Sequence, residues 1–461
     1  MGLTFLIDYT TKEYISKLVS NSLLTHADIT LLCLDCIRYH LHLKKGCAAG
    51  GIILSAPFLG YSVDYWTDHA IDCPEDKPAK RAAVAVLADT PLMNAVGMVQ
   101  GRNNRRFYLL FATETGLYHL IPDLHDRAPH RLNKPDIQGI TPLHLACILR
   151  HKLVVYALLS IKEIDVNVID TRGRSPLSFA AENGDIHIVR QLLDRDDLQV
   201  QHVNVALIFA ARKRQAETVE VFLRYKGVDV NVIDTGGRSP LSFAVENGDI
   251  HIVRQLLDRG DLQVQHVNVG LIFAAKEGQP EIVEVLLRYK GVDVKESGTI
   301  ALLEAARMGA VTVVEVLLKE EMIDVNAKTK TTGPSPLLKG VEALERNNYS
   351  EYGYTALHFA ASRKFCSLIQ VLLARCDVEV NARSNSGQTP LMIAAQEGRK
   401  DSVCLLLGHP EVDVRAEDDE RQTALEWAKK GKHCHNGFDA EDHDYNAIQL
   451  LLVDYLGRSA I

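Results

Sequence analysis

The sequence lacks a hydrophobic run that would span a membrane or direct secretion. Residues 47–63 form its longest uncharged stretch of note, but they include three glycines and a proline and are short for a span. The amino terminus has no basic region, and Asp8 interrupts its apolar residues, so we do not expect a signal peptide. These absences predict an intracellular chain, cytoplasmic or nuclear or both, without membrane contact.

The sequence also lacks an excess of positive charge. Its 51 lysines and arginines are outnumbered by 59 aspartates and glutamates, which gives a formal net charge of −8. No chain-wide basic surface for nucleic acid follows from this balance, and we expect no direct nucleic-acid contact. Hydrophobic residues make up 47% and charged residues 24%, as in ordinary folded proteins. Nine cysteines, an odd number and mostly among apolar residues, indicate free thiols in a reducing compartment.

The motifs of catalysis and cofactor binding are missing too. The chain has no Gly-x-x-x-x-Gly-Lys-Ser/Thr loop for phosphates and no Ser/His/Asp, Cys/His or paired-carboxylate arrangement. Cys33 and Cys36 share the apolar face of an expected helix, and His433, Cys434 and His435 lie in an expected polar loop. We interpret these as core and loop residues rather than metal ligands. We therefore expect no enzyme, no cofactor, no metal and no small-molecule substrate.

An internal duplication dominates what is present. Residues 170–233 and 234–297 align without gaps, and 51 of the 64 aligned positions are identical. Each copy divides into two similar halves, so the repeating unit is about half that length. The chain is therefore expected to be an array of small helical repeats.

Each half is expected to follow one plan. A polar turn, as at 170–173, precedes a short helix with Ser175 as its N-cap and Pro176 at its first position. Gly184 marks a turn that needs positive φ. A second helix follows, and its apolar face is predicted to contain Ile188, Val189, Leu192 and Leu193.

This pattern resembles the ankyrin repeat, a turn and two antiparallel helices of about 33 residues. The motif is clearest at Thr141-Pro142-Leu143-His144-Leu145-Ala146 and varies at Thr355, Thr389 and Thr423. Nine units start near residues 136, 170, 204, 234, 268, 298, 352, 384 and 418, and a tenth, degenerate unit spans 105–135. The resemblance implies that His144 and His358 connect neighbouring repeats through hydrogen bonds.

The predicted fold is an all-α ankyrin-repeat solenoid with a small amino-terminal helical segment. We place the helical segment at 1–72, a linker with a short helix at 73–104, and the repeat array at 105–456. Insertions interrupt the array near 329–351 and 431–444.

The first segment has a resemblance of its own. Tyr9–Tyr14, Ala27–Ile29 and Tyr65-Trp66 are similar to the region that follows the nucleotide-binding core in fungal NACHT–ankyrin proteins, which are NLR-like switches. Thr67 stands where those proteins carry glycine. Since no phosphate-binding loop is present, the resemblance extends to the sensor half of such proteins only.

The ankyrin resemblance implies that other proteins bind to a concave face of the stack. We hypothesise that this face includes exposed cations at turns and helix ends. The candidate residues are Arg172, Arg212, Lys213, Arg214, Lys276, Arg307, Arg363 and Lys364. Between the two copies, Arg212-Lys213-Arg214 is replaced by Lys276-Glu277-Gly278, whereas the apolar positions barely change.

The function that these observations favour is a non-catalytic scaffold or adaptor for protein–protein interaction, with a regulatory role. One version is a transcription co-regulator that acts through protein partners. The alternative is the sensor half of a fungal NLR-like signalling or defence protein that lacks its nucleotide-binding core.

Overall fold

A computed structural model describes residues 25–31, 33–34, 66–68, 70–72, 74–88, 108–329, 353–434 and 444–458. The elements of these residues are helices without strands, which confirms the predicted all-α class. The contacts divide the chain into two units, residues 1–228 and 229–461, which are described separately. Most of the predicted 1–72 segment lies outside the described residues, as do Cys36, the residues 330–352 and the residues 435–443.

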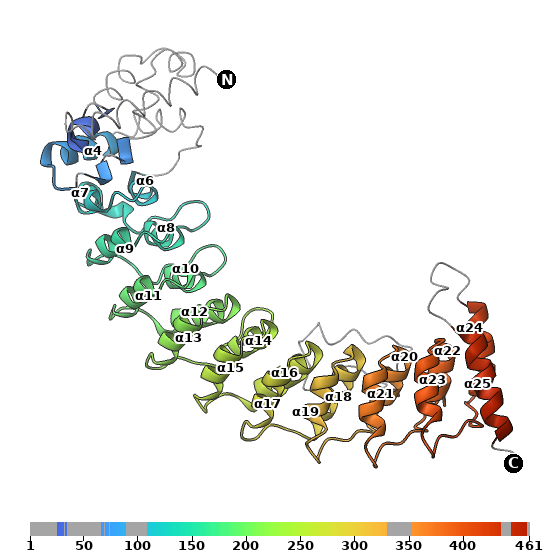
Figure 1. Ribbon diagram of the computed structural model, residues 1–461. Coiled ribbons are helices and arrows are strands. Elements are labelled where there is room, and N and C mark those ends of the chain that lie inside the picture. Colours follow the sequence, from blue (N-terminus) through green and yellow to red (C-terminus); the bar gives the residue numbers. More distant parts are fainter. Residues whose placement is uncertain are drawn as a thin grey trace, which may run out of the picture. The chain divides into compact units, whose positions relative to one another are not determined.

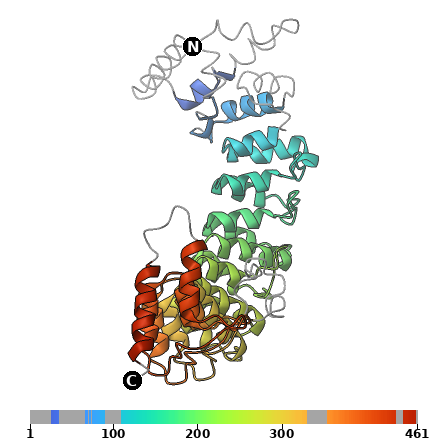
Figure 2. The same cartoon turned by 90° about the vertical axis from the view of Figure 1, so that its right-hand side faces the viewer.

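Residues 108–228 of the first unit form successive helix pairs (Figures 1 and 2). The even-numbered helices α6, α8, α10 and α12 pack against one another in a first-helix row, and α7, α9, α11 and α13 form a second-helix row. The helices of this unit are α4 (Lys77–Ala88), α6 (Tyr108–Glu114), η3 (Tyr118–Leu120), α7 (Ile121–Arg127), η4 (Pro129–Arg131), α8 (Pro142–Ile148), α9 (Lys152–Leu159), α10 (Pro176–Asn183), α11 (Ile186–Leu193), α12 (Val200–Arg212) and α13 (Ala216–Leu223).

The second unit repeats this arrangement, with even-numbered helices in one row and odd-numbered helices in the other. Its helices are α14 (Pro240–Glu246), α15 (Ile250–Leu257), α16 (Val264–Lys276), α17 (Pro280–Leu287), α18 (Glu296–Met308), α19 (Val311–Leu317), α20 (Ala356–Ser362), α21 (Cys366–Leu373), α22 (Pro390–Gln396), α23 (Lys400–Leu407), α24 (Ala424–Cys434) and α25 (Tyr445–Arg458).

The short first helices begin where the sequence predicts. Ser175 is the N-cap of α10 with Pro176 at the first position, and the Ser175 N–H donates to Ser178 Oγ at 3.3 Å. This pairing satisfies a backbone donor that the helix itself leaves unpaired. In the following α11, Ile188, Val189 and Leu192 are fully buried, as predicted, whereas Leu193 is half-buried.

Three repeats do not follow the common plan. The helices α12, α16 and α18 each run for 13 residues, and their first turns replace the polar turn and the capped start of the other repeats. They begin at Val200, Val264 and Glu296, before the unit boundaries that the sequence suggested. The expectation of one plan for every half-unit is therefore wrong. Because these repeats lack a Thr/Ser-Pro cap, no side chain stops the helix at its amino-terminal end. The helix therefore extends by about one turn towards the amino terminus.

Side-chain amides join consecutive repeats at their loops. Asn326 Nδ2 donates to the Asp377 carbonyl at 2.7 Å, and Asn326 Oδ1 accepts from the Glu379 N–H at 2.8 Å. Asn167, Asn231 and Asn381 make the same two contacts with the next repeat. The Asn326 contacts connect units on either side of residues 330–352, so the stack continues from α18 to α20.

The joint at these residues has the geometry of an ordinary repeat turn. In the turn that starts at Ser384, the Ser384 N–H donates to the Gln388 carbonyl and the Gly387 N–H to the Ser384 carbonyl. Thr329 N–H donates to the Tyr354 carbonyl at 2.9 Å, and Gly353 N–H to the Thr329 carbonyl at 3.2 Å. Residues 330–352 therefore enter between the two ends of a turn whose closing hydrogen bonds are kept.

The duplicated copies differ at two facing core positions. Ala181 and Ala206 of the first copy are replaced by Val245 and Gly270, and a Cβ added to Gly270 would lie 3.6 Å from Val245 Cγ2, at ordinary contact distance. We expect Gly270→Ala to raise the free energy of unfolding by about 1 kcal/mol, because alanine is the better helix former. Urea unfolding measures this gain. The reciprocal Ala206→Gly should lower the free energy of unfolding by a similar amount. No change from the parent in either variant would contradict the packing.

Candidate functional site

The histidines of the Thr-x-x-His motif connect neighbouring repeats. His358 Nδ1 lies 2.9 Å from Thr355 Oγ1 and accepts from the Thr355 N–H at 3.2 Å, so Nε2 carries the proton and donates to the Gln388 carbonyl at 3.0 Å. His144 does the same with Thr141 and the Arg174 carbonyl. The hydrogen bonds predicted for both histidines are confirmed. Burial lowers the pKa of His358 to about 4 and also lowers the pKa of His144.

The carboxyl-terminal ends of the first helices form a second contact between repeats. Here a side chain of one repeat donates to a carbonyl near the end of the preceding first helix, as Asn183 Nδ2 does to the Cys147 carbonyl at 3.1 Å. Arg399 Nε donates in the same way to the Ser362 carbonyl. These contacts add a side-chain donor to carbonyl groups at a helix end, where the regular pattern of helix hydrogen bonds stops. The ends of the first helices, where most of the candidate cations lie, therefore carry structural contacts as well as surface charge.

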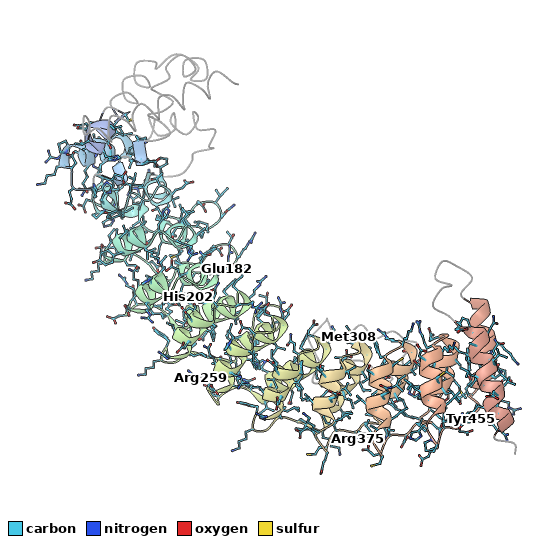
Figure 3. The ribbon with its side chains drawn as sticks, viewed as in Figure 1. Glu182, His202, Arg259, Met308, Arg375 and Tyr455 are labelled. Atoms are coloured by element: carbon cyan, nitrogen blue, oxygen red, sulfur yellow. The ribbon has the colours of Figure 1, made fainter. Side chains whose placement is uncertain are left out.

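In the first unit, three of the four candidate cations lie together. Arg212 ends α12, and Lys213 and Arg214 follow it, all exposed. Lys213 Nζ lies 3.2 Å from Glu182 Oε1 at the end of α10, on the first-helix side (Figure 3). Arg172 is exposed in the turn before α10, at the amino-terminal end of a first helix rather than the carboxyl-terminal end. The structure therefore groups Arg212, Lys213 and Arg214 and leaves Arg172 apart from them.

In the second unit, the candidates differ in exposure. Arg363 and Lys364, just after α20, are exposed. Lys276 is half-buried at the end of α16. Arg307 is only 21% exposed, because its guanidinium lies 2.6 Å from the Glu304 carboxylate one turn earlier on α18. It is thus not the exposed cation that the hypothesis assumed, and Met308 beside it is the exposed residue at the first-helix side (Figure 3).

One or two residues after each first helix from α6 to α22, one residue has a left-handed backbone. Glycine occupies this position in most of these repeats, with φ from 66° to 79°, which confirms the turn predicted at Gly184. Arg150, Arg214 and Lys364 occupy it in three others, with φ of 61°, 60° and 63°. A residue with a Cβ loses about 1–2 kcal/mol in this conformation, and attraction between a cation and the helix carboxyl end offsets part of that loss.

Arg150 is the member of this set that the sequence analysis missed. Its guanidinium Nε lies 3.6 Å from Asp185 Oδ2, and Lys152 Nζ lies 3.6 Å from Asp185 Oδ1 in the next repeat. The signal that identifies it is alignment with Gly184, because a cation stands where sister repeats carry glycine. Strained residues of this kind are concentrated at functional sites.

The described part of the chain contains neither a candidate metal site nor a membrane-spanning helix. Its histidines, cysteines and carboxylates include no group of three or more that would hold a metal ion. Its helices include none of sufficient length and apolar character to cross a bilayer.

Comparison with known proteins identifies the repeats. The family described as ankyrin repeats (3 copies) matches residues 109–204, 197–268, 261–329, 335–418 and 357–436, which together exceed half of the chain. The ankyrin repeat is generally a non-catalytic module, and it mediates binding to other proteins.

Three relatives show how far the similarity extends. "Ankyrin repeat protein nuc-2" of Neurospora crassa is 26% identical over 39% of this chain and 17% of its own length. "Ankyrin repeat domain-containing protein SAT10" of Stachybotrys chartarum is 32% identical over 33% of this chain and 8% of its own length. "Probable protein S-acyltransferase 23" of Arabidopsis thaliana is 30% identical over 33% of this chain and 29% of its own length. The chain thus spans less than a third of these proteins, and what it shares with the family is the repeat array itself: the chain is an ankyrin-repeat protein.

Proposed function

We propose that this chain is a non-catalytic adaptor with a regulatory role, and that the cations at the ends of its first helices contact a partner protein. The observation that carries the proposal is Arg214, an exposed arginine in a left-handed conformation that the duplicated copy gives to Gly278. Packing does not require the arginine, because the glycine of the second copy supports the same helix pair. We attribute the arginine at this strained position to contact with an acidic group of the partner.

The second copy supplies the variant that tests this proposal. Replacing Arg212-Lys213-Arg214 by the Lys-Glu-Gly of positions 276–278 inserts residues that the fold already accepts. We expect recovery of the partner by the tagged chain to fall at least tenfold, because two exposed cations are lost and one anion is gained. The free energy of unfolding, determined from thermal unfolding, should stay unchanged or rise by up to about 1 kcal/mol, since glycine relieves the strain at position 214.

A matched control distinguishes the cations from a general charge effect. Arg224→Glu changes an exposed arginine on the other side of the repeat, after α13, and should leave recovery unchanged. Undiminished recovery by the Lys-Glu-Gly variant would refute the proposal for these three residues.

Within this role we propose a transcription co-regulator that meets DNA only through its protein partners. The net charge of −8 supports the indirect contact, because it opposes binding to a polyanion. Co-purification from separate nuclear and cytosolic fractions tests it, with transcription factors or chromatin proteins expected from the nuclear fraction. Recovery of cytosolic signalling proteins alone would instead support the alternative role, the sensor half of an NLR-like protein.

A further inference from the structure

The second helices of the repeats present two outward positions to solvent. They are the second and fifth residues of the helix, and both are exposed in every second helix from α9 to α23. In seven of these eight helices, one or both positions carry a charged or polar residue. These pairs are His187 and Arg190, Glu217 and Glu220, His251 and Arg254, Glu281 and Glu284, Thr312 and Glu315, Ser367 and Gln370, and Asp401 and Cys404.

The helix α9 is the exception among them. It places Leu153 and Tyr156 at the two outward positions, and their side chains are 59% and 65% exposed. The buried face of α9 contains Val154, Val155 and Leu158, so its packing in the stack does not use the outward pair. Sister repeats show that polar residues suffice there. Two large exposed side chains on one helix face, with tyrosine among them, are typical of an interaction surface.

The neighbouring helix determines the chemistry of the partner. The outward positions of α11, which packs against α9, carry His187 and Arg190, and the ion pairs between described residues involve neither side chain. Packed helices lie roughly 8–10 Å apart, so these groups lie beside the apolar pair. The next helix, α13, presents Glu217 and Glu220, which repel an acidic ligand and therefore limit the cationic border to α11.

We propose that Leu153 and Tyr156, together with Arg190, form a docking surface for an acidic amphipathic segment of a partner protein. Apolar side chains of the segment pack on Leu153 and Tyr156, and a carboxylate of the segment pairs with the Arg190 guanidinium. This surface belongs to the second-helix row, whereas the cations of the proposed adaptor site lie at the ends of the first helices. The two surfaces are independent, and either can be lost without the other.

A random peptide library displayed on phage provides a defined probe for the full chain. Selection on the unchanged chain is followed by counter-selection on the double variant Leu153→Ser and Tyr156→Gln, which reproduces the Ser367 and Gln370 pair of α21. We expect an enriched consensus of apolar residues at helical spacing beside aspartate or glutamate. Both substitutions are at exposed positions, so the thermal melt of the variant should match that of the parent.

The synthesised consensus peptide is then titrated by fluorescence anisotropy. Tyr156→Gln alone should weaken binding at least tenfold, and Arg190→Glu should weaken it about tenfold, with binding that falls as salt rises. Arg254→Glu is the matched control, because Arg254 is the duplicate of Arg190 on α15, and it should leave the affinity unchanged. A consensus without acidic residues, equal effects of Arg190→Glu and Arg254→Glu, or no enrichment against the double variant would each overturn the proposal.

Discussion

The folded chain is expected to lose about 3 kcal/mol of stability between pH 6.5 and pH 4 through the side chain of His358 alone. Burial lowers the pKa of this histidine from 6.5 to about 4, and its Nδ1 must stay unprotonated to accept from the Thr355 N–H. The unfolded state therefore binds the proton first. The stabilising contribution is fully present above the unfolded pKa and is lost as the pH falls towards 4, at about 1.4 kcal/mol per pKa unit.

The variant His358→Ser isolates this effect from other titrating groups. Serine occupies the equivalent third position of α10 and α14 and completes the capping box there, so the helix start is preserved. At pH 7 we expect the variant to be less stable than the parent, because it loses the hydrogen bond to the Gln388 carbonyl. Urea unfolding at several pH values should then show the difference shrinking or reversing towards pH 4. Parallel curves for the two proteins would contradict a neutral, buried imidazole.

Gly139→Val is expected to destabilise the first unit by about 3 kcal/mol or more. Gly139 has φ of 82°, and a Cβ added to it would lie 2.8 Å from Asp170 Cα and from the Thr171 backbone nitrogen of the next turn. A β-branched residue there would have to adopt a strained backbone and separate two turns that the Thr171 N–H joins to the Gln138 carbonyl. The loss should appear in thermal unfolding and as faster amide exchange in α8 and α10.

Gly173→Val is the matched control for this prediction. Gly173 has φ of 75° in the equivalent turn, but a Cβ added to it would meet nothing within 4 Å. The reason is that α12, in the next repeat, has no such turn. The Gly173→Val variant should therefore lose only about 1–2 kcal/mol of the free energy of unfolding, through the strain of its backbone at positive φ. Equal losses in the two variants would mean that contact between neighbouring turns contributes nothing to the stack.

Much of the fold follows from local sequence rules. The N-cap at Ser175, the left-handed turn at Gly184 and the hydrogen bonds of His144 and His358 involve residue types with few alternative roles. The periodic apolar residues then determine which helix face is buried. The resemblance of residues 1–72 to the region after a NACHT core stays a prediction.

The remaining errors concern features that lie outside the repeat motif. Arg307 is partly buried because its guanidinium pairs with Glu304 one turn earlier, an i,i+3 contact that the spacing permits but does not require. The early starts of α12, α16 and α18 reflect the absence of a cap. An absent cap is a weaker sequence signal than a cap that is present. Arg150 was missed because its own repeat gives no signal, and only alignment with Gly184 of the next repeat places a cation at a left-handed position.

The joint between Thr329 and Gly353 has a consequence for how this chain changes over generations. Its hydrogen bonds hold the two ends at the spacing of an uninterrupted turn, and Asn326 still reaches the next repeat. Sequence can therefore be gained, lost or exchanged at this point without altering the register of the helices on either side, and loop entropy grows only slowly with length. Sequence inserted between Thr329 and Gly353 can therefore evolve separately from the repeats, and a reporter domain can be inserted by design at the same place.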